Sequence, residues 1–248
     1  MRNITGLLYQ PLDQFEIIFL GNIKNLYINN SLVYLIIVYI IIRLAFSLIL
    51  YDLRLIPYNW QIFMEQIYNF VFGLVKQQVN ISGYAYFPLI FTLFLFILIA
   101  NLVGMSLYSF TLTSHVTIAF TLSFSFFISI VFVGVLIQKM SFVNTFIPQG
   151  APKILKPFLI GIEIISYFSR PFSLGIRLFA NLMAGHTLLA ILANFTFLIS
   201  KKNVVIALLP FVLIVAIVGL EAMIAALQAY VFTVLVCIYL NDSIKGSH

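Results

Sequence analysis

The chain has 248 residues, of which 63% are hydrophobic and only 8% are charged, and its mean hydropathy is +1.13. Because a soluble domain carries about 25% charged residues, this composition excludes an ordinary soluble protein, a disordered chain and a coiled coil. The apolar residues are too numerous for one buried core, so most of them must face lipid. We expect an all-α polytopic membrane protein that forms a single membrane domain over residues 1–248.

The charge and the reactive residues exclude further classes of function. The net charge is +6, but the longest basic run is Lys201-Lys202 and no aromatic residues interleave with it, which argues against nucleic-acid binding. Cys237 is the only cysteine, the chain has three histidines, and it contains no phosphate-binding glycine motif. We therefore expect no disulfide, no cysteine-based metal cluster, no multi-haem site and no other bound metal or cofactor.

The first predicted membrane element follows a polar N-terminal segment. Residues 1–30 are polar enough to lie outside the bilayer, and the first apolar run covers residues 32–51. About 20 residues at 1.5 Å each cross a hydrocarbon core of about 30 Å, so this run predicts a transmembrane helix. Arg43 lies in its second half, from where a long side chain can extend to the nearer interface.

The middle of the chain predicts one helix of a different kind and one pair of spans. Over residues 59–80, polar residues recur every three or four positions and apolar residues fill the other face, which predicts an amphipathic helix lying in the interface. Residues 88–110 and 114–137 are uniformly apolar and predict a transmembrane hairpin with a very short turn. His115, at the end of a span, is expected at the interface.

Two long apolar runs complete the chain, over residues 157–200 and 204–240. As one helix, the second run would be about 55 Å long and would have to tilt by about 57° to cross about 30 Å. We expect two long, strongly inclined helices that turn at Lys201-Lys202. Two shorter spans in each run are the alternative.

Charged and polar residues concentrate in these two long runs. An arginine or aspartate at the centre of a membrane helix costs about 2.5–3.5 kcal/mol, so such residues are candidates for function. The candidates are Glu163, Arg170, Arg177, Asn181 and His186 in the first run, and Glu221, Gln228 and Asp242 in or at the end of the second.

Arg177 is the strongest candidate, because it lies about 20 residues from either end of its run and cannot easily extend to an interface. It stays protonated, so it can hold or release a carboxylate but cannot relay protons. Asn181, four residues later, shares its face and could orient the guanidinium or make an interhelical hydrogen bond. His186, nine residues later, points to the opposite face, and its imidazole can pass a proton. Structural salt bridges or hydrogen bonds are the alternatives.

The other polar residues form two further groups. Glu221 and Gln228 are seven residues apart, which places them on nearly one face, about 10 Å apart along the axis. Glu163, with Asp242 from the end of the last run, could line a second polar path. Arg170 precedes Pro171, and we interpret it as a structural residue at a kink. Small residues surround these groups and would allow a partner helix, or a helix of the same chain, to pack closely.

Several segments of the chain resemble subunit a of the F-type ATP synthases. The most specific is Ser173-Leu-Gly-Ile-Arg-Leu-Phe-Ala-Asn-Leu-Met-Ala-Gly-His186. The resemblance covers nearly the whole chain, and its other matching segments are Pro11–Glu16, Asn101–Met105, Glu221 with Gln228, and Tyr239–Asp242.

This resemblance implies a proton-conducting stator subunit that binds no nucleotide and is not catalytic alone. It implies two half-channels that pass protons to and from the carboxylates of a c-ring, coupling proton flow to rotation and ATP synthesis. The implied partners are that c-ring, the peripheral stalk, other membrane-sector subunits, lipid and protons, with no nucleic acid. Arg177 matches the essential arginine that separates the half-channels. The other matches are His186, Glu221 and Asn181 in the outer half-channel, Glu163 and Asp242 in the matrix half-channel, and Gln228 as the glutamine that faces the arginine.

The order of His186 before Glu221 resembles mitochondrial and alphaproteobacterial members. The resemblance at the N-terminal and C-terminal segments implies a multi-pass protein of the mitochondrial inner membrane, with a bacterial plasma membrane as the alternative. A function of another class is a stand-alone secondary proton or ion antiporter, but such folds show inverted repeats. No repeat relates the two halves here, and the membrane charges lie in the last third of the chain. A purely structural subunit would leave Arg177, His186 and Glu221 unexplained.

Overall fold

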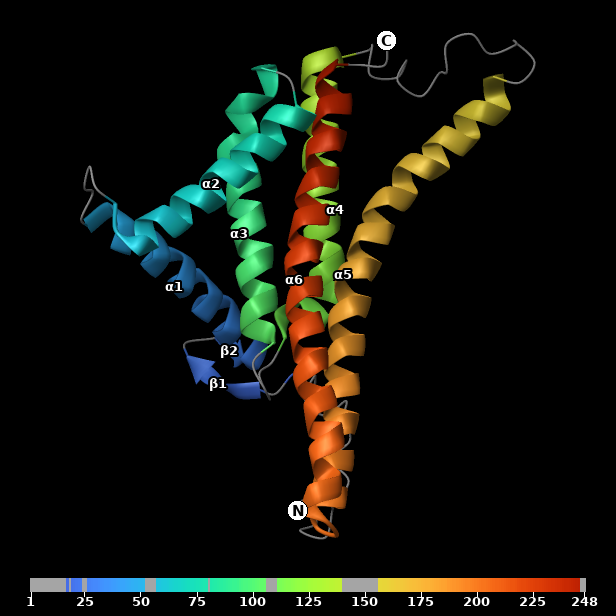
Figure 1. Ribbon diagram of the computed structural model, residues 1–248. Coiled ribbons are helices and arrows are strands. Elements are labelled where there is room, and N and C mark those ends of the chain that lie inside the picture. The colour runs from blue at the N-terminus through green and yellow to red at the C-terminus, as the bar shows by residue number, and fades with distance from the viewer. Residues whose placement is uncertain are drawn as a thin grey trace.

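The computed structural model describes residues 17, 19–23, 26–51, 57–79, 81–105, 111–139 and 156–245, and these residues are almost entirely helical. Figure 1 shows the helices side by side, with α6 in the middle of the bundle. The α-helices are α1 (Asn30–Tyr51), α2 (Asn59–Gln78), α3 (Phe87–Gly104), α4 (Val116–Gln138), α5 (Lys156–Ser200) and α6 (Val204–Lys245), and the 3-10 helices are η2 (Ile81–Tyr86) and η3 (Leu112–Ser114).

Five of these helical segments are long and apolar enough to cross a membrane: one each in α1, α4, α5 and α6, and one that runs from η2 through α3. The predicted class, an all-α polytopic membrane protein, is confirmed. The spans are Asn30–Ser47, Gly83–Gly104, Val116–Gln138, Phe158–Ser200 and Val205–Ile244.

The N-terminal region contains an element that the sequence did not predict. Strand β1 (Phe19–Ile23) pairs antiparallel with β2 (Leu26–Asn29), and α1 begins at the next residue. In α1, Arg43 is exposed. The predicted match at Pro11–Glu16 lies outside the described residues.

Helix α2 differs from the five candidate spans because polar residues recur along it, and one apolar stripe of it is buried. Met64, Val71, Leu74 and Val75 form that stripe, while Trp60 and most of the polar side chains are exposed. The stripe packs on α3 and α6, so that α2 runs obliquely across α3 in Figure 1. This is the amphipathic pattern that the spacing of polar residues predicts.

The turn between α3 and α4 is longer than expected. Helix α3 ends at Gly104, not at residue 110, and the connection runs from Met105 to His115 and includes η3. A side chain at Gly104 would lie 2.9 Å from Thr111 Cγ2, so the returning chain packs directly on the glycine. Hydropathy alone did not locate this end, because apolar residues continue past it. Residues 106–110 lie outside the described residues.

Helices α5 and α6 are each continuous, so the alternative of two short spans in each run is wrong. They have 45 and 42 residues, or about 68 Å and 63 Å at 1.5 Å per residue. A tight turn joins them, in which the backbone N–H groups of Lys202 and Asn203 both donate to the Ile199 carbonyl at 2.9 Å. Figure 1 shows the two helices together near this turn and α5 diverging from α6 towards its own N-terminus.

The apolar core lies around the second half of α6. Ala229, Phe232, Val236 and Leu240 are buried there among residues of α2, α3, α4 and α5. The first half of α6 is mostly exposed, for example at Leu209, which is 79% exposed. A long exposed apolar arm is stable only in lipid or against a partner, so the α5–α6 hairpin carries surface that the described part of the chain does not cover.

Candidate functional site

A histidine and a glutamate face each other where α5 packs on α6. His186 Nε2 lies 3.5 Å from Glu221 Oε1, and the two side chains are only 7% and 5% exposed. Neither oxygen of the Glu221 carboxyl has a hydrogen-bond partner in the described part of the chain. Because a buried carboxyl without a donor is costly, this geometry suits a group that exchanges protons with the histidine or with water.

Gly185 provides the space for the Glu221 carboxyl. A methyl group at position 185 would lie 2.7 Å from Glu221 Oε1 and 3.0 Å from its Cδ. The carboxyl therefore lies directly on the backbone of α5, next to His186. Small residues in this region were predicted to allow close helix packing. Gly185 allows it between α5 and α6 of the same chain.

A cavity of about 320 Å³ lies beside this pair. Its polar lining consists of Asn101, Asn181, Glu221 and Gln228, and the rest of the lining is mostly apolar. Across the two helices, Asn181 Nδ2 donates to Gln228 Oε1 at 3.3 Å. Since a water molecule occupies about 30 Å³ in the liquid, the cavity has room for about ten waters. It can therefore hold water next to the Glu221 carboxyl.

Asn101 was not among the residues singled out for chemistry. It is fully buried on α3, and its Nδ2 donates to the Ala225 carbonyl of α6 at 3.4 Å. Its Oδ1 accepts from Thr113 Oγ1 at 3.0 Å. The amide thus joins α3, η3 and α6 at one wall of the cavity. The signal was available in the sequence, since an amide inside an apolar span is expected to hydrogen-bond another helix.

Arg177 lies on the other side of α5. His186 is buried against α6, whereas Arg177 is exposed, as their spacing predicts. In the described structure no carboxylate lies within ion-pair distance of Arg177. Gln228, which the resemblance expects to face the arginine, accepts a hydrogen bond from Asn181, one helical turn from Arg177. The face with Arg177 also carries the small, exposed residues Ala180 and Ala184.

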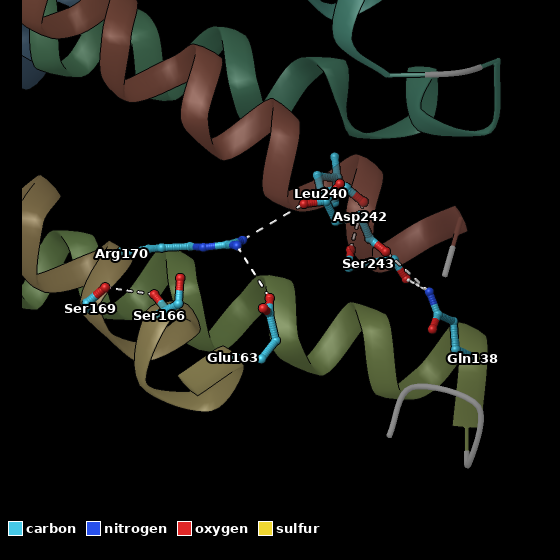
Figure 2. A network of polar contacts seen from close by, with 8 residues as sticks. All are labelled: Gln138, Glu163, Ser166, Ser169, Arg170, Leu240, Asp242 and Ser243. Atoms are coloured by element: carbon cyan, nitrogen blue, oxygen red, sulfur yellow. Dashed lines mark hydrogen bonds and ion pairs between the residues drawn. The ribbon is translucent and has the colours of Figure 1, made fainter. Parts of the chain in front are cut away.

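The second predicted acidic pair lies towards the N-terminus of α5 and the C-terminus of α6. Glu163 and Asp242 both lie beside Arg170, at 3.9 Å from its guanidinium in each case (Figure 2). Each carboxylate side chain is 47% exposed. The structure therefore brings together the two acids that the sequence suggested for a second path, and adds an arginine between them.

Two further predictions concern other ligands and His115. The described ranges contain no group of three or more His, Cys, Asp or Glu side chains that could hold a metal ion. His115 precedes α4 as its N-cap, and burial lowers the pKa of this imidazole below its usual value.

Comparison with known proteins places the whole chain in one family. The family model of the ATP synthase A chain matches residues 31–241. The chain is 45% identical to "ATP synthase subunit a" of Acanthamoeba castellanii, over 98% of this chain and 100% of the relative. The proteins of the same name from Marchantia polymorpha (45% identity, 95% of this chain and 98% of the relative) and Chondrus crispus (44%, 95% and 96%) are similarly close. The chain therefore belongs to the ATP synthase A chain family, whose members are subunits of the membrane sector.

Proposed function

We propose that this chain is the proton-conducting stator subunit of an F-type ATP synthase, in which Arg177 separates two half-channels that serve the carboxylates of a c-ring. The observation that carries the proposal is the position of Arg177. It is exposed on α5 with no carboxylate of the described chain within ion-pair distance. A guanidinium at membrane depth needs a counter-charge, which a neighbouring subunit would supply.

The surface around Arg177 suits a closely packed helix that carries such a carboxylate. Ala180 and Ala184 follow at one-turn intervals on the same exposed face of α5. At about 4 Å, a pair of unit charges at a protein surface interacts with about 4 kcal/mol. That energy is large enough to keep a passing carboxylate ionised and small enough to let it leave once it is protonated.

The two polar groups on α5 lie on either side of Arg177 along the helix axis. His186 is nine residues, or about 13 Å, towards the hairpin turn, and Glu163 is fourteen residues, or about 21 Å, in the other direction. A proton that enters at His186 and Glu221 can therefore reach Glu163 and Asp242 only past the charge of Arg177 or on a moving partner. Asn181 and Gln228 belong to the first path because they line its cavity.

The proposed cycle follows from these positions. A proton passes through the cavity to His186 and Glu221 and neutralises a carboxylate of the ring, which can then move into lipid at little cost. After nearly a full turn the carboxylate meets Arg177 and releases its proton towards Glu163 and Asp242. Each charge that crosses 100 mV delivers about 2.3 kcal/mol. The chain itself is not catalytic, and the ring, the peripheral stalk and other membrane-sector subunits are its proposed partners.

We further propose that the protein lies in the mitochondrial inner membrane. The three relatives named above are eukaryotic. In this chain the histidine, His186, precedes the acid, Glu221, which is the order that resembles mitochondrial members. Detection of the assembled complex in purified inner-membrane vesicles tests this location, and detection only in another membrane fraction would contradict it.

The test of the function is ATP synthesis by membranes that carry Arg177→Ala. We expect synthesis to fall below about 1% of wild type, because about 4 kcal/mol of charge attraction corresponds to a factor of several hundred. Passive proton leak should rise at the same time. Arg43→Ala, which removes an exposed arginine on α1, is the matched control and should leave synthesis near normal. Near-normal synthesis in assembled Arg177→Ala complex would contradict the stator role.

A further inference from the structure

Arg170 has more interactions than a residue that only marks a kink. Its guanidinium lies 3.9 Å from Glu163 on its own helix and 3.9 Å from Asp242 on α6. The Tyr167 and Tyr239 rings lie 5.4 Å and 5.1 Å from the guanidinium carbon, close enough for cation–π contact. Side chains of two helices that are far apart in sequence thus surround one cation, as Figure 2 shows for the two acids.

The α6 end of this cluster is held by α4. Gln138 Nε2 donates to the carbonyl oxygens of Ser243 at 2.6 Å and of Asp242 at 3.4 Å, as drawn in Figure 2. This amide fixes the backbone that carries the Asp242 carboxylate. Among the described residues, the titratable groups that face Arg170 are Glu163 and Tyr167 from α5 and Tyr239 and Asp242 from α6. Helix α4 contributes Gln138, which does not titrate.

Among the described side chains, this cluster brings two carboxylates to one guanidinium. Removing the charge of Arg170 would take away the cation that lies beside both of them. Arg170 is only 28% exposed, whereas both carboxylates are 47% exposed and can reach water. An arginine does not give up its proton at any relevant pH, so it supplies a constant field to two groups that can.

We propose that Arg170 is a positioning residue of the release path: it holds Glu163 and Asp242 together as ionised acceptors for protons that leave the Arg177 region. This inference rests on the proposed function. Arg170 does not touch the carboxylate of a partner; it acts through the two acids. Its neighbours Tyr167 and Tyr239 keep the guanidinium between the two helices.

A packing role makes a different prediction from this electrostatic one. If Arg170 only fills the space between the two tyrosines before Pro171, an unbranched apolar side chain should replace it. If its charge is what matters, lysine should replace it better than methionine does. The variants Arg170→Lys and Arg170→Met therefore separate the two roles. Ser169→Ala is the matched control, since Ser169 is the adjacent, exposed residue and its hydroxyl donates to the Ser166 carbonyl on the same helix.

The experiment measures ATP synthesis in membrane vesicles, per amount of assembled complex, against the pH of the compartment at the C-terminal end of α6. We expect Arg170→Lys and Ser169→Ala to follow the wild-type profile. Arg170→Met should lose about fivefold or more, which is the effect of a partly exposed charge contact of about 1 kcal/mol. The loss should be greatest at acidic pH, where the two carboxylates, no longer beside a guanidinium, retain a passing proton and slow its release, and should shrink as the compartment becomes alkaline.

Each of the other outcomes overturns the proposal. Equal rates of ATP synthesis in Arg170→Met and Arg170→Lys would assign Arg170 to packing. So would a pH profile of Arg170→Met that runs parallel to that of wild type. If Arg170→Met does not assemble, Arg170→Gln is measured in the same way, and if neither neutral variant assembles, the charge serves assembly and not conduction. Arg177→Ala in the same membranes keeps the two hypotheses apart. If Arg177→Ala abolishes synthesis while Arg170→Met keeps the wild-type pH profile, only the role of Arg170 is rejected.

Discussion

The two polar groups of α5 contain similar chemistry in opposite surroundings. His186 and Glu221 are almost fully buried, and among the described residues the only ion-pair partner of the glutamate is this imidazole, which is charged only when protonated. Glu163 and Asp242 are half exposed and share a permanent cation, Arg170. A buried carboxyl without a fixed counter-charge is suited to carry a proton, whereas an exposed, ion-paired one is suited to remain ionised.

Under the proposed function, this contrast gives the two groups different roles in one direction of proton flow. The buried pair lies beside a cavity of about 320 Å³ and can take up protons from water inside the protein. The exposed pair lies at the end of the helices, where it can pass protons to the surrounding water. In the proposed cycle, their separation along α5 places the charge of Arg177 between the site of uptake and the site of release.

Matched substitutions of the two glutamates are the strongest way to break the comparison. Glu221→Gln should reduce ATP synthesis about 100-fold, the lower range for loss of a proton-transferring group, because His186 then has no acid to exchange with. Glu163→Gln should cost only about fivefold, since Asp242 remains beside Arg170. Rates per assembled complex, measured in vesicles, check both values. Equal losses would show that burial does not distinguish the two sites.

A second test sharpens the role of space at the buried site. Gly185→Ala places a methyl group 2.7 Å from Glu221 Oε1, which is the far end of a flexible side chain. The carboxyl should move away from His186, so we expect about tenfold slower synthesis while the complex still assembles. Gly161→Ala is the control on the same helix, because a methyl group there meets nothing within 4 Å. Equal rates in the two variants would show that the position of the carboxyl is unimportant.

The smallest expected effect concerns the wall of the cavity. Thr113→Val removes the donor to Asn101 Oδ1 and leaves that buried oxygen without its hydrogen bond, at a cost of about 1–3 kcal/mol. Thermal denaturation of the purified complex should begin at a lower temperature, with little change in the initial rate of synthesis. Thr121→Val removes only an exposed hydroxyl that bonds its own helix and should not alter the transition. An unchanged transition in Thr113→Val would exclude a supporting role for Asn101.

The sequence predicted most of the helices because length and apolarity act locally. A run of about 20 apolar residues can cross a membrane only as a helix, and the long runs over α5 and α6 exceed one ordinary span. The spacing of Arg177 and His186 also placed them on opposite faces, because helical geometry needs no partner to be calculated. These predictions needed no knowledge of which helices touch.

The contacts between segments that are distant in the sequence could not be predicted from it and were seen only in the tertiary structure. The β1–β2 hairpin and the end of α3 at Gly104 depend on contacts that hydropathy does not encode. Arg170 was interpreted as a kink residue, because only the return of α6 brings Asp242 to it. The sequence by itself thus determined which residues are too polar for their surroundings. The packing of α5 on α6 decided which of them meet, because ion pairs and cavities depend on distances between helices that the order of residues does not specify.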